Sequence, residues 1–306
     1  MNRIKYLIDR FIFRIKQKDS FFNIFKLITK NIFYSSNKID LDQLQIDKNF
    51  ISLEDLCLKF GADKGYYDSK KTFWNYYKNL ETRSKFKNYL DWINRKDPKN
   101  YDYELGLNYA PLYEKYFYEL RNKEIKILEI GVAAGHSLAC WYFYFPKAQI
   151  WGIDVKEKSY VQYKGKRMSY HIIDCLDDDS AENFAKKFGD FDIIIDDSIH
   201  DHPAFETNMK NFYPYLKSGG YYCLEDFRNS DRKLEGIRKY NQSKGNKLWK
   251  YNITMAEMFD FMKNKKYFEQ EIFKKKDLKY IFDNTESINV HYQEHPTSSL
   301  GVMKKK

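Results

Sequence analysis

Short runs of hydrophobic residues alternate with longer amphipathic segments from Glu124 onward. The hydrophobic runs predict strands at 126–130, 150–154, 170–173, 192–196 and 221–224. The segments between and after them predict helices at 137–145, 180–188, 204–216 and 254–264, and two final strands are expected near 287–292 and 298–304. Apolar strands separated by helices are typical of a parallel sheet that is covered on both faces. The pattern therefore predicts an α/β core domain over residues 121–306.

Residues 51–120 have the pattern of a mostly helical cap that precedes this core. Ser52 and Asp55 provide the capping chemistry that opens a helix, and the Gly-Ala-Asp-Lys-Gly turn at 61–65 closes it. Further helices are expected at 70–96 and 109–120.

The first fifty residues form a basic, amphipathic extension. Residues 1–34 repeat apolar side chains at helical spacing with Arg and Lys between them, and residues 35–50 have the composition of a linker. Two interpretations stay open: a helix that makes peripheral membrane contact at the inner face of the membrane, and a helix that packs on its own core or on a second subunit. We favour the second, because lysines on a polar face are also ordinary solvation.

Composition narrows the class of protein. The 306 residues are 43% hydrophobic, which is enough for a core, and no apolar run is long enough for a membrane span. The N-terminal pattern is not that of a signal peptide, and the four cysteines have no metal-type spacing, so a cytoplasmic protein with free thiols is expected. The net charge of +10 comes with no nucleic-acid module, so no nucleic-acid partner is expected.

The strand at 126–130 runs into a glycine turn that is typical of nucleoside binding. Glu129, Gly131, Gly135 and Ser137 surround this turn, and Asp154 ends the next strand. Glycines let the backbone approach a ligand closely, and an acid at the second strand end accepts hydrogen bonds from ribose hydroxyls. The G-x-x-x-G spacing differs from the dinucleotide fingerprint, which favours S-adenosylmethionine (SAM) over NAD.

A third acid, Asp174, ends the third strand, where it can accept a hydrogen bond from an adenine amino group. Asp154 and Asp174 each have an alternative role as turn or cap residues. Three acids at three successive strand ends beside a glycine turn are harder to explain by structure alone, so we interpret them as a cofactor site.

The ends of the fourth and fifth strands carry a second set of acids. Asp197 ends the fourth strand with His200 three residues later, and Glu225 and Asp226 end the fifth. Neighbouring strands lie about 4.8 Å apart, so these carboxylates can converge on one hard cation such as Mg²⁺. The alternative is that Asp197 caps the helix near Pro203 and that the other two acids cap the next segment. An imidazole beside the ion suits His200 as a general base, whereas His202 is expected to be a surface residue.

The motifs together resemble a known family. LEIGV-x-x-G-x-S, W-x-x-YFP-x-A-x-I-x-GID, FDIIIDD-S-x-H and GGYY-x-LED are similar to the metal-dependent sugar O-methyltransferases of macrolide biosynthesis, of the mycinamicin and macrocin type, with the cephalosporin-hydroxylase-like proteins as relatives. The similarity runs from about Leu56 to Lys305, because the GADKG turn resembles the S-DKG turn of this family. One departure is that the family's usual D-G-S-H is D-S-I-H here.

This resemblance implies a Rossmann-like class I methyltransferase fold, a mostly parallel seven-stranded sheet with helices on both faces and a helical N-terminal cap. It places Asp197, Glu225 and Asp226 at the positions of the metal ligands and His200 at that of the general base. Glu129, Asp154 and Asp174 fall on SAM-contacting positions. The implied reaction is methyl transfer to a sugar or sugar-nucleotide acceptor, as in surface-glycan or other glycoconjugate biosynthesis, by a homo-oligomer.

Three other functions stay open from the sequence. A nucleic-acid methyltransferase is disfavoured, because amino-directed enzymes carry an N/D-P-P-Y/F turn where this chain has Asp-Asp-Ser-Ile at 196–199. A hydroxylase-like or other metal enzyme on the same fold is the second. A non-catalytic SAM-binding partner subunit is the third, which the complete set of acids with His200 disfavours.

Overall fold

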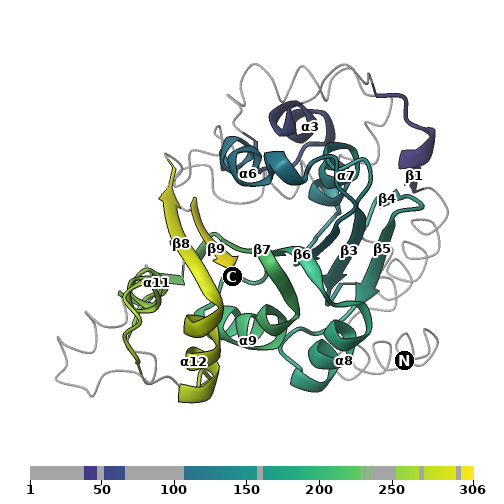
Figure 1. Cartoon of the computed structure of the whole chain (residues 1–306). Coiled ribbons are helices and arrows are strands. Elements are labelled where there is room, and N and C mark those ends of the chain that lie inside the picture. The colour runs from purple at the N-terminus through teal and green to yellow at the C-terminus, as the bar shows by residue number, and fades with distance from the viewer. Residues whose placement is uncertain are drawn as a thin grey trace, which may run out of the picture.

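A computed structural model gives the fold of the chain (Figure 1). The structure describes residues 38–46, 52–65, 107–156, 161–228, 230–231, 234–235, 253–268, 272–293 and 298–306. The predicted helices at 1–34 and 70–96 lie outside these residues.

The core is a seven-stranded, mostly parallel sheet. Its strands are β2 (Lys126–Ile130), β3 (Gln149–Asp154), β5 (Met168–Ile172), β6 (Phe191–Asp196), β7 (Leu216–Glu225), β8 (Thr285–Tyr292) and β9 (Ser299–Lys305). Their order is β5-β3-β2-β6-β7-β9-β8, and only β9 runs antiparallel to its neighbours. β3 lies on one side of β2 and β6 lies on the other, so the strand order reverses at β2. In open α/β sheets, ligands bind at such a point, beyond the carboxyl ends of the strands.

Helices cover both faces of this sheet, as Figure 1 shows. One layer contains α3 (Leu53–Phe60), α6 (Ala110–Phe117) with the 3₁₀ turn η2 (Tyr118–Leu120), and α7 (His136–Tyr144). The other contains α8 (Asp178–Phe188), α9 (His202–Phe212) with the turn η3 (Tyr213–Tyr215), α11 (Met255–Lys263) and α12 (Lys275–Asn284). Alternate residues of the central strands point to opposite faces, so Ile127 and Ile193 pack in one core while Leu128 and Ile194 pack in the other.

The predicted fold is therefore confirmed, and most elements begin and end within a few residues of their predicted bounds. In the cap, the Ser52 hydroxyl accepts a hydrogen bond from the Asp55 N–H, and Gly61 ends α3 in the left-handed conformation at φ 71°. The helix α12 was not expected, because its sequence has few apolar positions. Only its face with Leu278, Ile281 and Phe282 is buried.

Part of the predicted linker is attached to the core. β1 (Ile39–Asp40) pairs in parallel with β4 (Tyr163–Lys164), and the turn η1 (Leu41–Gln43) follows it with Leu41 buried. The Tyr142 hydroxyl donates a hydrogen bond to Asp42, which fixes this segment to α7. Among the described helices, none is long and apolar enough to cross a membrane.

Candidate active site

Four parallel strands bring the predicted site residues to one edge of the sheet. β2 ends before Gly131, β3 ends at Asp154, β6 ends before Asp197, and β7 ends at Glu225. The backbone ties these ends together, because the Gly131 N–H donates to the Ile153 carbonyl and the Asp197 N–H donates to the Ile130 carbonyl. Both predicted halves of the site therefore share this edge.

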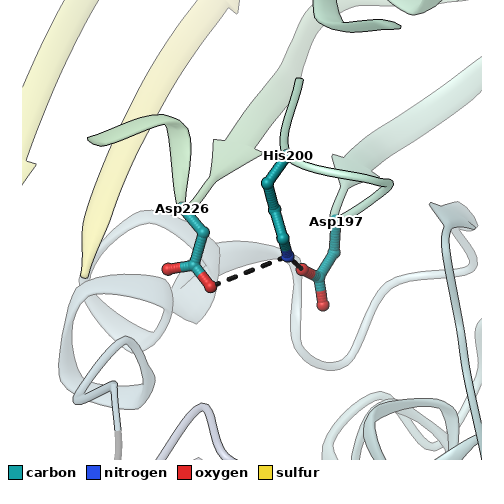
Figure 2. A group of neighbouring side chains, drawn as sticks. All are labelled: Asp197, His200 and Asp226. Carbon is teal, nitrogen blue, oxygen red and sulfur yellow. Dashed lines mark ion pairs between the residues drawn. The ribbon is translucent and has the colours of Figure 1, made fainter. Parts of the chain in front are cut away.

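Three side chains converge at the end of β6 and β7 (Figure 2). His200 Nε2 lies 3.7 Å from Asp197 Oδ1 and 3.9 Å from Asp226 Oδ2. The ligand atoms of the three residues all lie within 4.8 Å of one another, a spacing that suits one shared metal ion. Within the described part of the chain this is the group with metal-ligand geometry, and we call it the acid–histidine group.

An unusual backbone aims two of these side chains. His200 has φ 53° and Asp226 has φ 55°, in the left-handed region that non-glycine residues seldom occupy. Such conformations cluster at functional sites, where the surrounding structure holds them. Ser198, which replaces the family's glycine, does not have a positive φ, so the loss of that glycine is tolerated at this position.

Asp226 is held from its other side. The Tyr109 hydroxyl donates to Asp226 Oδ1 at 2.6 Å and accepts a hydrogen bond from the Ser299 N–H at 2.7 Å. Oδ2 of Asp226 is therefore the oxygen that faces His200. Tyr109 precedes α6, so the cap and the last strand β9 both fix this carboxylate.

Glu225 is fully buried and does not belong to the acid–histidine group. Lys64 Nζ lies 2.7 and 2.6 Å from its two carboxylate oxygens, and the Tyr113 hydroxyl donates to Oε1. Both oxygens of Glu225 thus already have donors in the structure. Its predicted role as a metal ligand stays a prediction, whereas Asp197 and Asp226 have the placement that this role requires.

Glu129, in β2 two residues before Gly131, is fully buried. Its Oε2 accepts a hydrogen bond from Trp141 Nε1 at 3.0 Å, and its Oε1 lies 3.5 Å from Lys64 Nζ. The Glu129 side chain therefore links β2 to α7 and to Lys64. Direct contact with the cofactor stays a prediction.

Burial determines the charge states of these acids. It raises the pKa of both Glu225 and Asp226 to about 8, although Lys64 and Tyr109, respectively, act in the opposite direction. Burial also raises the pKa of Asp197 well above its usual value, against the opposing charge of Lys64. For Lys64 burial acts to lower the pKa, but the carboxylates of Asp197, Glu225 and Glu129 outweigh it and raise the pKa well above its usual value.

The glycine turn is built for close approach. Gly131 and Gly135 have φ 86° and 82°, and Gly135 is the residue before α7. Ser137 is buried in the first turn of that helix. Asp154 Oδ2 accepts a hydrogen bond from the Ala133 N–H at 3.0 Å, so Asp154 already fixes the turn and keeps further acceptor capacity for a ligand.

Asp174 lies at the same edge, beyond β5, and its side chain is exposed. Its Oδ1 accepts a hydrogen bond from the Leu176 N–H at 3.0 Å, which is the local turn interaction foreseen as the alternative. This bond does not exclude a contact with adenine, which stays a prediction. Large apolar side chains are exposed around it, namely Val155, Ile172 and Leu176.

The structure removes one alternative for Asp197 and corrects the expectation for His202. The residue that caps α9 is Asp201, whose Oδ1 accepts from the His202 N–H. Asp197 is therefore not the cap. His202 is not a surface residue: it is 4% exposed and its Nδ1 lies 3.0 Å from the carboxylate of Glu206.

Sequence reasoning missed Lys64, Tyr109 and Tyr113, which hold the acids of the site. Lys64 belongs to the Gly61–Gly65 turn in the sequence, yet it contacts Asp197 and Glu225, which lie 133 and 161 positions later in the chain. A lysine within a glycine-flanked turn is the one signal that the sequence offered.

No protein-family model matches the chain. It is 34% identical to the mycinamicin VI 2''-O-methyltransferase of Micromonospora griseorubida over 125 residues, which cover 39% of this chain and 31% of that protein. It is 32% identical to the demethylmacrocin O-methyltransferase of Streptomyces fradiae, again over 39% of this chain and 31% of that protein.

The chain resembles the sugar O-methyltransferases. A third relative of this type is the 8-demethyl-8-(2-methoxy-alpha-L-rhamnosyl)-tetracenomycin-C 3'-O-methyltransferase of Streptomyces olivaceus, 32% identical over 39% of this chain and 32% of that protein. The chain thus spans about a third of the length of these curated relatives. Among solved structures, the MycE methyltransferase in complex with Mg, SAH and mycinamycin VI has a TM-score of 0.49 and 24% identity, and the match covers 64% of this chain and 49% of that one.

Proposed function

We propose that the chain is a SAM-dependent, divalent-metal-dependent O-methyltransferase that acts on a sugar hydroxyl. The observation that carries the proposal is the acid–histidine group, which stands at the sheet edge directly beside the glycine turn. The sugar O-methyltransferases that the chain resembles support the choice of reaction.

The residues fit a hard divalent cation. Asp197 and Asp226 each turn one carboxylate oxygen toward a common point, and no cysteine belongs to the group. Oxygen ligands of this kind suit Mg²⁺, which keeps several positions for water or substrate oxygens. Burial raises the pKa values of these two acids, and a bound cation would offset the cost of ionising them.

The residues also fit an adenosyl group. Gly131 and Gly135 shape the turn with positive φ angles, Ala133 between them is exposed, and Asp154 is half-buried at the neighbouring strand end. Ile172 is the register partner of Asp154, and together with Val155 it exposes apolar surface beside that acid, as a purine ring requires. Asp174 would then lie at the adenine end of the pocket.

The chemistry divides between the bound groups and the chain. When bound, SAM would supply the methyl group and the ion would lower the pKa of a coordinated sugar hydroxyl. Asp197 and Asp226 would hold and orient that assembly. His200, at 3.7 and 3.9 Å from these carboxylates, would accept the hydroxyl proton. Glu129 and Lys64 would fix the buried side of the site, where Lys64 contacts both Glu129 and Asp197.

The wider role belongs to the same proposal. The acceptor would be a sugar or a sugar nucleotide in surface-polysaccharide or other glycoconjugate biosynthesis. A cytoplasmic homo-oligomer without a nucleic-acid partner is expected, and the basic residues 1–34 would supply either a subunit contact or a peripheral membrane contact.

The test is a screen of nucleotide-activated sugars with SAM and Mg²⁺, in which methylated product is detected by mass. Product formation that EDTA abolishes and Mg²⁺ restores would support the proposal. Turnover that EDTA leaves unchanged would remove the metal from it. SAM binding without transfer to any acceptor would favour the non-catalytic subunit, and oxygen insertion in place of methylation would favour a hydroxylase-like enzyme.

A further inference from the structure

Lys64 is a buried cation between the two halves of the site. Its side chain is 1% exposed. Its ammonium lies 3.0 Å from Asp197 Oδ2, 2.6 Å from Glu225 Oε2 and 3.5 Å from Glu129 Oε1. One positive charge therefore faces three carboxylates that come from three different strand ends.

The position of Lys64 is fixed by its backbone as well as by these charges. Its carbonyl accepts hydrogen bonds from the Tyr109 N–H at 2.7 Å and from the Ala110 N–H at 2.8 Å, at the start of α6. The preceding Asp63 carbonyl accepts from the Leu107 N–H at 2.7 Å. A surface lysine samples many conformations, but this one is held by the cap and aimed at the sheet edge.

The two oxygens of Asp197 have different neighbours. Oδ2 faces the Lys64 ammonium at 3.0 Å, and Oδ1 faces His200 Nε2 at 3.7 Å. The carboxylate of Asp197 thus lies between the Lys64 ammonium and His200. A cation bound at that group would share Asp197 with Lys64, and the two positive charges would repel each other over a short, largely desolvated distance.

We propose that Lys64 is a positioning residue that lowers the affinity of the site for its divalent ion and thereby makes the bound ion a stronger Lewis acid. The inference rests on the proposed function, since it needs an ion at the acid–histidine group. A ligand that shares its negative charge with an ammonium donates less charge to a metal. The ion then stays more electron-poor, and a coordinated hydroxyl loses its proton more readily.

Two neutral variants test this claim. Lys64→Met keeps the length of the side chain without its charge, and Lys64→Gln keeps hydrogen-bond donors. We expect Mn²⁺, measured by its electron paramagnetic resonance signal without SAM, to bind at least about tenfold more tightly to both. Turnover at saturating metal should fall about 10- to 100-fold. Damage to the fold alone would weaken both Mn²⁺ binding and turnover. Tighter Mn²⁺ binding together with slower turnover therefore distinguishes the proposed role of Lys64 from a structural one.

Lys305→Met is the matched control. Lys305 is also a buried lysine, but its ammonium donates to the carbonyls of Pro214 and Leu216 at 3.1 and 2.6 Å, away from the acids of the site. Its replacement should lower stability and leave the Mn²⁺ affinity of the folded protein unchanged.

Glu129→Gln should change the Mn²⁺ affinity in the opposite direction, and it tests the inference if neither Lys64 variant folds. It removes a carboxylate that neutralises Lys64 without belonging to the acid–histidine group, so Mn²⁺ should bind several-fold more weakly. The inference is overturned if the folded Lys64 variants bind Mn²⁺ as tightly as the wild type or more weakly. If the Lys64 variants do not fold, it is overturned when Glu129→Gln binds Mn²⁺ as tightly as the wild type. A wild-type protein that binds no Mn²⁺ removes the metal from the proposed function and the inference with it.

Discussion

Gly131 lies directly against the backbone of Asp197. A Cβ atom added to Gly131 would stand 2.1 Å from the Asp197 carbonyl oxygen and 2.8 Å from the Cα atom of Ser198. The glycine turn of the proposed cofactor pocket and the loop of the acid–histidine group are therefore in contact, with no room for a side chain between them.

Gly131→Ala should disturb both halves of the site at once. The backbone of 197–198 must shift, so we expect the affinities for S-adenosylhomocysteine and for Mn²⁺ each to fall by about tenfold or more, with a stability loss of about 1–3 kcal/mol from the left-handed φ. Calorimetry and thermal unfolding measure these changes. Gly219→Ala is the control, because Gly219 has φ 75° but open space around it. Gly219→Ala should lose stability and keep both ligand affinities. If Gly131→Ala bound both ligands as tightly as the wild type, the result would contradict the contact between the glycine turn and the Asp197 loop.

Asp154→Ala should weaken cofactor binding. The variant removes the proposed ribose acceptor and leaves the N–H groups of Ala133 and Lys156 without their carboxylate partner. We expect the S-adenosylhomocysteine affinity to fall about tenfold or more, by calorimetry, since each such hydrogen bond to a charged group contributes about 1.5–3 kcal/mol. Asp192→Ala is matched to it, because Asp192 also accepts from a backbone N–H, that of Lys126, but at the opposite edge of the sheet. Equal losses in the two variants would mean that Asp154 is structural.

His200→Ala should collapse turnover without affecting cofactor binding. General-base catalysis typically contributes about 10²–10⁴-fold in rate, so a loss of this size is expected in kcat for methyl transfer. The S-adenosylhomocysteine affinity should stay unchanged, because His200 belongs to the other half of the site. His291→Ala, on β8, should keep full turnover. If His200→Ala also kept it, the assignment of the base would be wrong.

Metal affinity should rise with pH up to about 8. Burial raises the pKa of Asp226, which belongs to the acid–histidine group, to about 8, so in the metal-free protein this acid holds a proton at neutral pH, and an ion must displace it. We expect Mn²⁺ affinity to increase from pH 6 to about pH 8 and to level off above it, with protons released on binding. Calorimetry in buffers of different ionisation enthalpy counts these protons.

The same pKa predicts the stability of the metal-free protein. In the unfolded chain Asp226 titrates near about 4, so between about pH 4 and pH 8 the folded state binds more protons. Stability without metal should therefore fall as pH rises through this window and level off above it. Asp226→Asn should flatten part of this dependence. A wild-type stability that rises with pH over the window would contradict the assignment.

The sequence predicted the sheet and its edge because these depend on local patterns. Ile127, Leu128 and Ile130 are apolar on both faces of a buried strand, and the acids follow such strands directly. The turn at Gly131 and the cap at Ser52 also carry local signals, and the structure has both.

The sequence did not predict the contacts that come from distant segments. Lys64 and Tyr109 belong to the cap, and nothing local relates them to Glu225 or Asp226, which follow more than a hundred residues later. The direction of the Glu225 side chain depends on these partners. A strand-end motif gives the position of a carboxylate but not the cation that it will face.

The Tyr109 hydroxyl bonds both Asp226 and Ser299, which lie 117 and 190 positions later in the chain. During synthesis, the first five strands of the sheet would emerge long before β9. Until β9 arrives, Asp226 lacks the backbone partner that its N–H has at the Ser299 carbonyl. Competence for catalysis would thus be acquired late in folding, after most of the hydrophobic interior has already formed.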